Sequence, residues 1–561
     1  MCAGVIVLKF GGSVLTDEHG LRTAVHEVYR WRRLGWRVVA VVSAFAGRTD
    51  ALLASCRLDG VSADPHATAA IMACGERESA ARLVGCLDRV GVPAALLDPC
   101  AIGLRARGGA LDAMPLGFDR SSVHGPLESL RCVVVPGFFA CDEAGRIVTL
   151  GRGGSDLTAL VLADGLRADR CLLVKDVDGL YEHDPAAAGP RPRLFEHASY
   201  DDVLELDGSI VQHKAVRFAR DRGIEFEAGS AGGARATRVA ACRSTLAGEH
   251  RRERPLRVAL LGLGAVGGGV LEVLSRTSDR FECVAACVRD PRKHAEWQER
   301  LGSVSLSTDA VEVASCGADV VVEAMGGVDA ARRSIDAAFR AGSHVVTANK
   351  AVLAEHGQEL RELAKLCGRE LRASAAVGGG TPVLEAAIRL EAINVRGVLN
   401  GTANFVLERL RDGDALEDAV AEAQRSGLAE ADPSRDLDGR DALDKLRVIA
   451  QACDRRIERV EISGADVRSV RTRVRARQVA SISEDGIARV AIEEVEVGDP
   501  LFDLPGEWNA AEIKGADGQS CVMRGRGAGR WPTAESVVAD LFDLEREAIF
   551  TWPGTRSLAT A

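Results

Sequence analysis

Residues 258–270 read VALLGLGAVGGGV, and this stretch decides how the second half of the chain folds. An apolar run leads directly into the spacing Gly262-x-Gly264-x-Val266-Gly267. In a strand–turn–helix unit of this kind, the first glycine permits a tight turn, the second lets the backbone approach a pyrophosphate, and the third lets the helix pack closely on the strand. The helix that follows offers free N–H groups to phosphate. The stretch predicts a dinucleotide-binding turn, here near the middle of a 561-residue chain.

The length and composition of the chain limit the classes of protein to consider. One hydrophobic core rarely exceeds about 250–300 residues, so 561 residues predict several domains. The formal net charge of −10 is spread along the chain without a basic tract, which argues against nucleic-acid and membrane partners. The fifteen cysteines form no CxxC pair and no Cys/His cluster at zinc spacing, so we expect reduced thiols in a cytoplasmic protein. The start MCAGVIVLKFGGS has no basic region followed by a long apolar one, so we expect no signal peptide. No apolar run approaches the ~20 residues of a membrane span.

The alternation of short Val/Leu/Ile runs with longer helical segments predicts an α/β fold with parallel or mixed sheets. GVIVLKF is followed by a helical stretch near 22–35 and then by RVVAVVSAF. The polar segment 247–256, AGEHRRERPL, indicates a linker, after which the same rhythm restarts. The pattern becomes more helical around 405–455 and strand-like again at RVAIEEVEV after residue 470. We therefore expect two α/β units, the second of them bipartite.

Two strand ends in the second half carry positively charged side chains that are candidates for ligand binding. The strand in FECVAACVRD ends near Arg289, where NAD enzymes usually place an acidic residue on the ribose. A guanidinium there could instead receive a 2′-phosphate, which favours NADP over NAD; the alternative is a solvated loop residue. The strand in VVTANKAVLA leads into Thr347 and Lys350, at the sheet edge where ligands of such folds bind. Taken alone, a lysine after a strand is more often a solvated charge.

The stretch GLAEADPSRDLDGRDALDKLRVIA (427–450) is rich in carboxylates ahead of a lysine. Asp441 and Lys445 are four residues apart, so they share one helix face. A carboxylate beside the ammonium would keep Lys445 charged and oriented to give a proton to a developing alkoxide. The alternative is an acidic loop that caps a helix with one surface salt bridge. The other carboxylates of the stretch are Glu430, Asp432, Asp436 and Asp438.

These motifs, taken together, resemble homoserine dehydrogenase over residues 256–561. Also in the family's order are EAMGG (323–327), VGGGTPV (377–383), VLNGTANFVL (398–407) and GRGAGRWPTAESV (525–537). The resemblance implies reversible hydride transfer between NAD(P)H and aspartate β-semialdehyde, giving homoserine. It implies a Rossmann-type nucleotide domain at 256–380, an α+β catalytic and dimerisation domain at 381–520, and a segment at 521–561 that returns to the nucleotide domain.

The same resemblance implies roles for individual residues. Lys350 and Lys445 would flank the reacting oxygen, with Lys445 as the proton donor and Asp441 orienting it. Glu430 and Thr402 would contact the substrate. The family also holds a monovalent cation, Na⁺ or K⁺, by main-chain oxygens, here those of Ser374, Val377, Gly379 and Thr381, although Ser374 replaces a usual Glu. The cofactor contacts would be Gly262, Gly264, Val266, Gly267, Arg289, Thr347, Lys350, Gly401 and Gly527, the last in a Gly-Ala-Gly turn at 527–529.

The first half contains the parts of a phosphate-handling site. VLKFGGSVLTD (7–17) places Lys9 at a strand end before Gly11 and Gly12, where backbone N–H groups could form an anion nest. The alternative is a strand with an ordinary glycine turn. TLGRGGSDLTA (149–159) opens a helix with Arg152, suited to a carboxylate, and Asp156, suited to an amino group or a metal-bound phosphate. The loop in LLVKDVDGLYEHDP could bind an adenine nucleotide with Mg²⁺. Together with the anion nest, Lys9 and the residues suited to a substrate, it provides the groups that phosphoryl transfer requires.

Residues 5–230 resemble aspartate kinase, of the amino-acid kinase family. The resemblance is carried by KFGGS, VVSAFAGRTDALL (41–53), CGERESAARL (74–83), GFFACDEAGRIVTLGRGGSDLTA (137–159), KDVDGLYEHDP and SYDDVLELDGSIVQHKAV (199–216). It implies a three-layer sandwich over 1–243, a linker at 244–255, and ATP with Mg²⁺ as the phosphoryl donor. Lys9, Gly11 and Gly12 would hold the phosphoryl group. Aspartate would be surrounded by Ser43, Thr49, Glu76, Arg152 and Asp156, and the nucleotide would meet Lys175, Asp176 and Tyr181.

The first half also departs from that family. Its first motif is one residue shorter than the usual KFGGTSV, Lys175 stands where Thr is usual, Ala186 replaces an Arg, and VQHKAV lacks the Pro and Arg of LHPRAV. The segment between 243 and 256 leaves no room for the two ACT regulatory domains that usually follow the kinase, so feedback inhibition through them is not expected.

Three hypotheses follow for the function of the chain. The first is a fusion of both activities in aspartate-family amino-acid biosynthesis, acting on aspartate, aspartate semialdehyde and homoserine. The second is a homoserine dehydrogenase whose kinase-like domain is catalytically silent and serves binding or assembly. The third, a nucleotide-sensing protein with neither activity, is disfavoured by the set Lys350, Asp441 and Lys445. Both families usually self-associate, so we expect a homo-oligomer.

Overall fold

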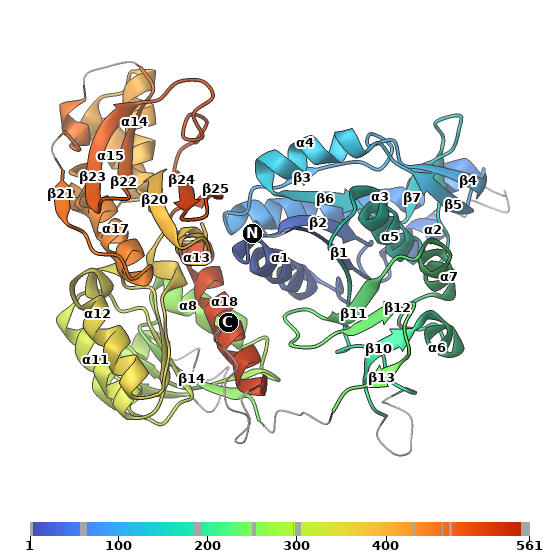
Figure 1. The fold of residues 1–561 in the computed structure, drawn as a ribbon, viewed down its shortest axis with the longest axis horizontal. Helices are drawn as coiled ribbons and strands as arrows, with labels where there is room; N and C mark the ends of the chain where they lie inside the picture. Colours follow the sequence, from blue (N-terminus) through green and yellow to red (C-terminus); the bar gives the residue numbers. More distant parts are fainter. Residues whose placement is uncertain are drawn as a thin grey trace. The chain divides into compact units, whose positions relative to one another are not determined.

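The computed structural model of the protein describes residues 4–55, 64–184, 192–248, 254–294, 297, 304–429, 432–462, 464–470 and 474–550. The chain divides into two compact units, coloured by sequence in Figure 1. The N-terminal unit comprises Ala3–Asp88 and Pro93–Arg251, and the C-terminal unit comprises Met1–Cys2, Arg89–Val92 and Arg252–Ala561.

The N-terminal unit is built on a nine-stranded sheet. Its strands are β1 (Val5–Phe10), β2 (Arg37–Val42), β3 (Ala95–Leu96), β6 (Cys132–Pro136), β9 (Arg170–Lys175), β10 (Phe195–Ser199), β11 (Phe226–Ser230), β12 (Thr237–Ala240) and β13 (Thr245–Leu246). They are ordered β13-β10-β12-β11-β9-β1-β2-β6-β3, and the strands from β9 to β6 are parallel. All six residues of β1 are buried, so both faces of the sheet are covered.

Helices cover the two faces of this sheet. They are α1 (Glu18–Arg33), α2 (Arg48–Ser55), α3 (Pro65–Arg89), α4 (Arg120–Leu130), α5 (Gly154–Leu166), α6 (Tyr200–Glu205) and α7 (His213–Arg222). Apolar residues of α5 and α7 pack with Val5 and Val7 of β1. Helix α1 contacts β1 and β2 without joining that cluster, which places it on the other face. The expected three-layer α/β arrangement is therefore confirmed.

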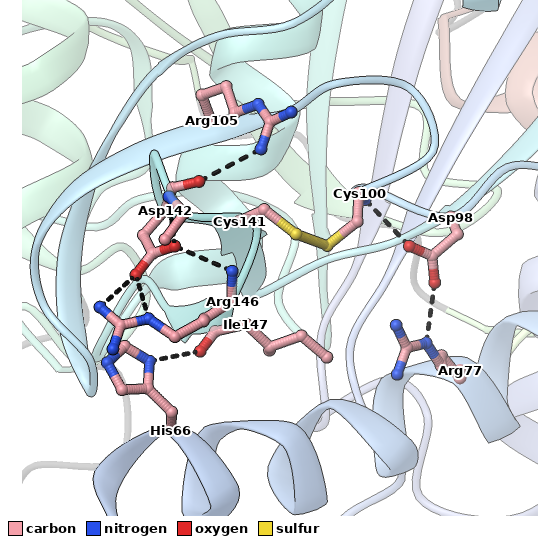
Figure 2. The surroundings of a disulfide bond; sticks show 10 residues. His66, Arg77, Asp98, Cys100, Arg105, Cys141, Asp142, Arg146 and Ile147 are labelled. Atoms are coloured by element: carbon pink, nitrogen blue, oxygen red, sulfur yellow. Dashed lines mark hydrogen bonds and ion pairs between the residues drawn. A yellow bond between two sulfur atoms is a disulfide. The ribbon is translucent and has the colours of Figure 1, made fainter.

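A smaller four-stranded sheet lies beside the large one in the same unit, and it corrects one prediction. It has the order β5-β4-β7-β8, with β4 (Arg105–Gly109), β5 (Asp112–Gly117), β7 (Phe139–Cys141) and β8 (Ile147–Thr149). Cys100 and Cys141 form a disulfide (Figure 2), so the expectation of reduced cysteines throughout is wrong for this pair. The cause is tertiary: Arg105 pairs with Cys141 across β4 and β7, and the turn before β4 brings Cys100 beside it. The two residues are 41 positions apart, which local spacing does not reveal.

The C-terminal unit begins with a six-stranded sheet in which every pair is parallel. Its order is β16-β15-β14-β17-β18-β19, as a doubly wound dinucleotide fold requires. The strands are β14 (Leu256–Leu261), β15 (Phe281–Cys287), β16 (Ser305–Ser307), β17 (Val320–Glu323), β18 (His344–Thr347) and β19 (Leu371–Arg372). The helices are α8 (Ala265–Leu274), α10 (Ala310–Ala314), α11 (Asp329–Arg340) and α12 (Lys350–Leu366), with a 3-10 turn η1 (Pro291–His294).

A second six-stranded sheet, mainly antiparallel, forms the rest of this unit, in the order β21-β23-β22-β20-β24-β25. Its strands are β20 (Ala392–Val398), β21 (Arg459–Glu461), β22 (Ala476–Ile482), β23 (Ile487–Glu494), β24 (Trp508–Gly515) and β25 (Ser520–Arg526). Its helices are α13 (Val383–Arg389), α14 (Gly401–Asp412), α15 (Leu416–Arg425), α16 (Ser434–Leu437) and α17 (Arg440–Ala452), with 3-10 turns η2 (Ser374–Ala376) and η3 (Val467–Ser469).

The last helix, α18 (Arg530–Phe550), returns to the nucleotide-type sheet. It contacts α8, and its Val537 and Leu541 share a core cluster with Val258 and Leu260 of β14. The bipartite second half expected from the sequence is confirmed, since the strands and helices form a parallel sheet followed by a mixed α+β part. Among the described helices, none is both long and apolar enough to cross a membrane.

Candidate active sites

The glycine turn after β14 has the geometry that its spacing predicts. Gly262 has φ of +98°, in the region where a side chain is strained. A Cβ on Gly267 would overlap the carbonyl oxygen of Gly262, so only glycine allows helix α8 to approach the turn this closely. Gly264 precedes α8 and has open space on the side where a Cβ would point. The amino end of α8, with Val266 in its first turn, is therefore free to receive a phosphate group.

Arg289 lies just beyond the end of β15 with an exposed side chain. The neighbouring carboxylate of Asp290 is paired with Arg292, at 3.0 Å between Oδ1 and Nε. Among the described residues, no acidic side chain is paired with Arg289. A guanidinium without an acidic partner at this strand end fits a phosphate better than a ribose hydroxyl.

Three predicted catalytic residues meet at one point of the C-terminal unit. Lys445 Nζ lies 2.8 Å from Asp441 Oδ2, on the same face of α17 as predicted, and Lys350 Nζ lies 2.9 Å from Asp441 Oδ1. Lys445 Nζ also donates a hydrogen bond of 2.6 Å to the carbonyl oxygen of Leu399. Asp441 and Lys445 are buried, whereas the Lys350 side chain is 41% exposed. One carboxylate thus holds two ammonium groups, which the sequence spacing alone did not show.

The ion pairs of this cluster keep Asp441 and Lys350 in their charged forms. Burial raises the pKa of the Asp441 carboxyl, but the ammonium groups of Lys445 and Lys350 outweigh burial and hold that pKa well below its usual range. The charge of Asp441, opposed by burial, raises the pKa of Lys350. Asp441 is therefore an anion, and Lys350 a cation, throughout the neutral pH range.

Two residues of the site were not assigned from the sequence. The Asn400 side chain donates hydrogen bonds of 2.7 Å to both Asp436 and Asp441, and its oxygen caps α14. Burial and then the charge of Asp441 raise the pKa of Asp436. The signal for Asn400 was its position as an N-cap before the Gly-Thr that opens α14.

The acidic stretch 427–450 also contains Asp432, Asp438 and Glu430. Asp432 accepts hydrogen bonds from Ser434, and Asp438 is paired with Arg440, so both carboxylates are engaged locally and do not join the cluster. Glu430 lies outside the described residues.

The turns expected around the nicotinamide, at Gly401 and Thr402 and at Gly527, each contact other segments, and Gly527 contacts Gly379 of the loop expected to hold a cation. The hydroxyl of Thr402, next to Gly401 at the start of α14, donates to the carbonyl oxygen of Leu428 at 2.7 Å. A Cβ on Gly379, whose φ is +56°, would lie 2.8 Å from the carbonyl oxygen of Gly527. Gly527 itself lies against the side-chain amide of Asn509. Gly379 is therefore required by a close backbone contact, and Gly527 by its contact with the Asn509 side chain.

The segment expected to hold a monovalent cation is buried beside α18. Ser374 donates both its N–H and its hydroxyl to the carboxylate of Asp540, at 3.1 Å and 2.7 Å. Val377 and Thr381, further along the same loop, are buried as well. Ser374 is the donor in both of these hydrogen bonds, so Asp540 ties the start of this loop to α18.

In the N-terminal unit, one cavity of about 960 Å³ lies at the carboxyl ends of β1, β2 and β9 and at the amino end of α5. Cavities of this size accommodate a nucleotide or a drug-sized molecule. The structure brings together every residue that the sequence assigned to this site. The lining includes Lys9, Gly11, Gly12, Ser43, Thr49, Glu76, Arg152, Asp156, Lys175, Asp176 and Tyr181.

Asp156 is the charged centre of this cavity. Its Oδ1 lies 2.7 Å from Lys9 Nζ, and its Oδ2 lies 3.4 Å from Lys175 Nζ. All three side chains are buried. Burial opposes ionisation of Asp156, but Lys175 and Lys9 outweigh it and lower the pKa of this carboxyl. Burial, only partly opposed by Asp156, lowers the pKa of Lys175 to about 8.

Glu76 adds a second carboxyl to the cavity. Burial raises the pKa of Glu76 well above its usual range, although the charge of Lys9 opposes the shift. Among the described residues, its Oε2 atom has no hydrogen-bond partner while being fully buried. A buried oxygen of this kind is costly unless a ligand supplies a donor. The position fits an ammonium group on a bound substrate.

The fold and the two sites define the class of protein: an NAD(P)-type oxidoreductase joined to a kinase-type domain in one chain. Residues 4–226 match the amino acid kinase family, residues 262–373 the NAD binding domain of homoserine dehydrogenase, and residues 382–542 homoserine dehydrogenase. The chain belongs to the homoserine dehydrogenase family and carries an amino acid kinase domain ahead of it. It is an enzyme that fuses a kinase domain with a dehydrogenase.

Two homoserine dehydrogenases agree in sequence with this assignment for the second half. The homoserine dehydrogenase of Pseudomonas aeruginosa is 35% identical over 321 residues, which cover 52% of this chain and 73% of the relative. That of Bacillus subtilis is 33% identical, over 51% of this chain and 72% of the relative. A solved homoserine dehydrogenase from Thiobacillus denitrificans is 34% identical with a TM-score of 0.48, covering 53% of this chain and 74% of that one.

Proposed function

We propose that the C-terminal unit reduces aspartate β-semialdehyde to homoserine with NADPH, and that the N-terminal unit transfers a phosphoryl group from ATP to aspartate. The observation that carries the first part is the sharing of Asp441 by Lys350 and Lys445 at the edge of the sheet. The second part rests on the cavity that gathers Lys9, Asp156 and Lys175. The experiments that test the two parts are the Lys445 and Lys9 variants described in the Discussion.

In the dehydrogenase site, Lys445 is the residue that we assign as the proton donor. When bound, the nicotinamide supplies the hydride that adds to the aldehyde carbon. An ammonium has three N–H donors, and here Asp441 and the Leu399 carbonyl take two of those of Lys445. The third remains for the aldehyde oxygen, and its proton moves to that oxygen as the alkoxide forms. The ammonium group of Lys350 contacts the other carboxylate oxygen of Asp441. It stabilises the negative charge that develops on the aldehyde oxygen.

We assign NADP as the preferred cofactor on the strength of Arg289. Replacing Arg289 by alanine should raise KM for NADPH about 10- to 100-fold and KM for NADH less than about threefold, because only NADPH carries the 2′-phosphate that the guanidinium would bind. Steady-state kinetics with both cofactors measure this difference. Arg292→Ala is the matched control, since that guanidinium is already paired with Asp290. Equal changes for NADPH and NADH in Arg289→Ala would leave Arg289 as a solvated loop residue.

In the kinase site, the charges of the cavity divide into two groups. Lys9 and Lys175, with the N–H groups near Gly11 and Gly12, would hold the phosphates, which need positioning and charge stabilisation more than covalent chemistry. The Glu76 carboxyl and the Arg152 guanidinium, together with Ser43 and Thr49, would bind the ammonium and carboxylate groups of aspartate. Asp176 and Tyr181 would contact the nucleotide, and Mg²⁺ would arrive with ATP.

The lowered pKa of Lys175 makes ATP binding sensitive to pH. Lys175 is an ammonium below its pKa of about 8 and becomes a neutral amine as the pH rises through that value. We expect KM for ATP to rise several-fold between about pH 7 and pH 9.5, because a phosphate contact loses its charge. The Lys175→Thr variant should have a higher KM at neutral pH and a flatter pH profile. The same rise in both proteins would exclude Lys175 as its source.

We further propose a cytoplasmic homo-oligomer whose loop of Ser374, Val377, Gly379 and Thr381 holds Na⁺ or K⁺ by carbonyl oxygens. For the domains we propose residues 1–243 for the kinase, 244–255 for the linker, 256–380 for nucleotide binding, 381–520 for catalysis and dimerisation, and 521–561 for the returning segment. The contact of α18 with α8 supports the return of the last segment, whereas β25 (Ser520–Arg526) still belongs to the second sheet.

A further inference from the structure

A buried glutamate lies at the carboxyl edge of the nucleotide-type sheet, outside the set of residues assigned above. Glu323 is the last residue of β17, and its side chain is fully buried. Its neighbours across the sheet are Leu261 of β14, which precedes the glycine turn, and Thr347 of β18. Burying a carboxyl group without hydrogen bonds is costly, so the hydrogen-bond partners of Glu323 indicate the role of its side chain.

The carboxyl of Glu323 joins the loops that follow two neighbouring strands. Its Oε1 accepts a hydrogen bond of 2.9 Å from the N–H of Met325, in the loop after β17. Its Oε2 accepts one of 2.7 Å from the hydroxyl of Thr347, and Asn349 Nδ2 lies 3.5 Å from Oε1. Burial raises the pKa of Glu323, and these hydrogen bonds oppose the shift. One side chain thus fixes both the Met325 turn and the Thr347–Asn349 turn.

The second of these turns leads to the reacting groups through a short series of hydrogen bonds. The Thr347 hydroxyl accepts from the N–H of Asn349 at 3.0 Å. The Asn349 oxygen caps α12 by accepting from the N–H groups of Ala351 and Val352, at 3.2 Å and 3.3 Å. Lys350 is the first residue of α12, so the position of this cap sets where its ammonium meets Asp441.

We propose that Glu323 is a positioning residue for the reduction, which holds the turn of Thr347 and Asn349 so that Lys350 reaches Asp441 and the reacting oxygen. The inference rests on the function proposed for the C-terminal unit. The hydrogen-bond partners of Glu323 are Met325, Thr347 and Asn349, and in this proposal it acts on the reaction through Lys350. Its removal therefore affects turnover more than cofactor affinity.

The test is the Glu323→Gln variant of the full-length enzyme, which keeps the size of the side chain but places an amide group where the Thr347 hydroxyl now donates. We expect kcat for semialdehyde reduction to fall about 10- to 50-fold while Kd for NADPH, from fluorescence titration, changes less than about threefold. Asp319→Asn is the matched control. Asp319 adjoins the opposite end of the same strand, where it pairs with Arg254, and its replacement should change kcat less than about twofold.

Combining Glu323→Gln with Lys350→Ala distinguishes a positioning role of Glu323 from a general effect on the folded structure. In a Lys350→Ala background, Glu323→Gln should cost less than about a further twofold in kcat, because the group being positioned is gone. The same factor in both backgrounds, an unchanged kcat, or a loss confined to Kd for NADPH would overturn the inference. If Glu323→Gln does not fold by circular dichroism, Glu323→Asp, which draws the carboxylate back from the Thr347 hydroxyl, gives the same comparison. A Lys350→Ala enzyme with normal kcat would instead overturn the proposed function.

Discussion

Replacing Lys445 by alanine should remove most homoserine dehydrogenase turnover, by about 10²- to 10⁴-fold in kcat, the range that general acid catalysis supplies. The physical reason is that Asp441 and Leu399 hold two N–H groups of the Lys445 ammonium, and we propose that the third donates to the substrate oxygen. Kd for NADPH should change little, because the nucleotide turn lies on β14 and α8. Stopped-flow reduction of the semialdehyde and fluorescence titration of NADPH measure the two quantities.

Two comparisons make that result specific. Lys514→Ala, an exposed lysine on β24 of the same unit, should leave kcat unchanged. The loss of a buried ion-pair partner also destabilises a protein by about 3–5 kcal/mol, so the thermal unfolding temperature of Lys445→Ala must be measured. In this variant Asp441 retains Lys350 as a partner, which limits that loss. Turnover close to that of the unaltered enzyme would contradict the assignment of Lys445 as the proton donor.

The second large effect concerns the kinase. ATP-dependent formation of aspartyl hydroxamate from aspartate, Mg²⁺ and hydroxylamine should fall about 10²- to 10³-fold in Lys9→Ala, as expected when one preorganised positive charge at the transferring phosphoryl group is lost. Lys9 is buried against Asp156 in the cavity, so water cannot substitute for its ammonium group easily.

The dehydrogenase activity of the same protein is the internal control for this experiment. Lys9 lies in the N-terminal unit, so Lys9→Ala should reduce semialdehyde at the normal rate. Hydroxamate formation that persists in Lys9→Ala would show that Lys9 does not hold the phosphoryl group. No hydroxamate from the unaltered protein, with normal reduction of the semialdehyde, would favour a kinase-like domain with a binding or assembly role.

The sequence predicted those features that depend on local spacing. The turn at Gly262 and Gly267 and the helix face shared by Asp441 and Lys445 follow from positions a few residues apart, and the structure contains both. The meeting of Lys9 and Asp156 in one cavity was implied by the resemblance to the kinase family and not by local spacing, since Lys9 lies on β1 and Asp156 on α5.

Features that depend on distant segments were not predicted. Asn400 lies 41 residues from Asp441, and nothing in its local sequence marks it as a bridge between two carboxylates. The Cys100–Cys141 disulfide likewise depends on how β4 pairs with β7. In the sequence, Glu323 only marks the end of an apolar strand. The folded sheet shows that its side chain reaches Thr347. Sequence patterns describe neighbours along the chain, whereas these contacts arise between strands and loops.

Asp156 and Asp441 lie on unrelated folds, yet each carries one negative charge between two lysines. Counting these three side chains alone, and with both lysines protonated, each set carries one net positive charge. Such a set attracts small anions, and the substrates that we propose for the two reactions bear phosphate or carboxylate groups that would neutralise it. Sulfate and inorganic phosphate should therefore compete with substrate in both halves of the enzyme, so salts of multivalent anions should inhibit both activities more than chloride does at equal ionic strength.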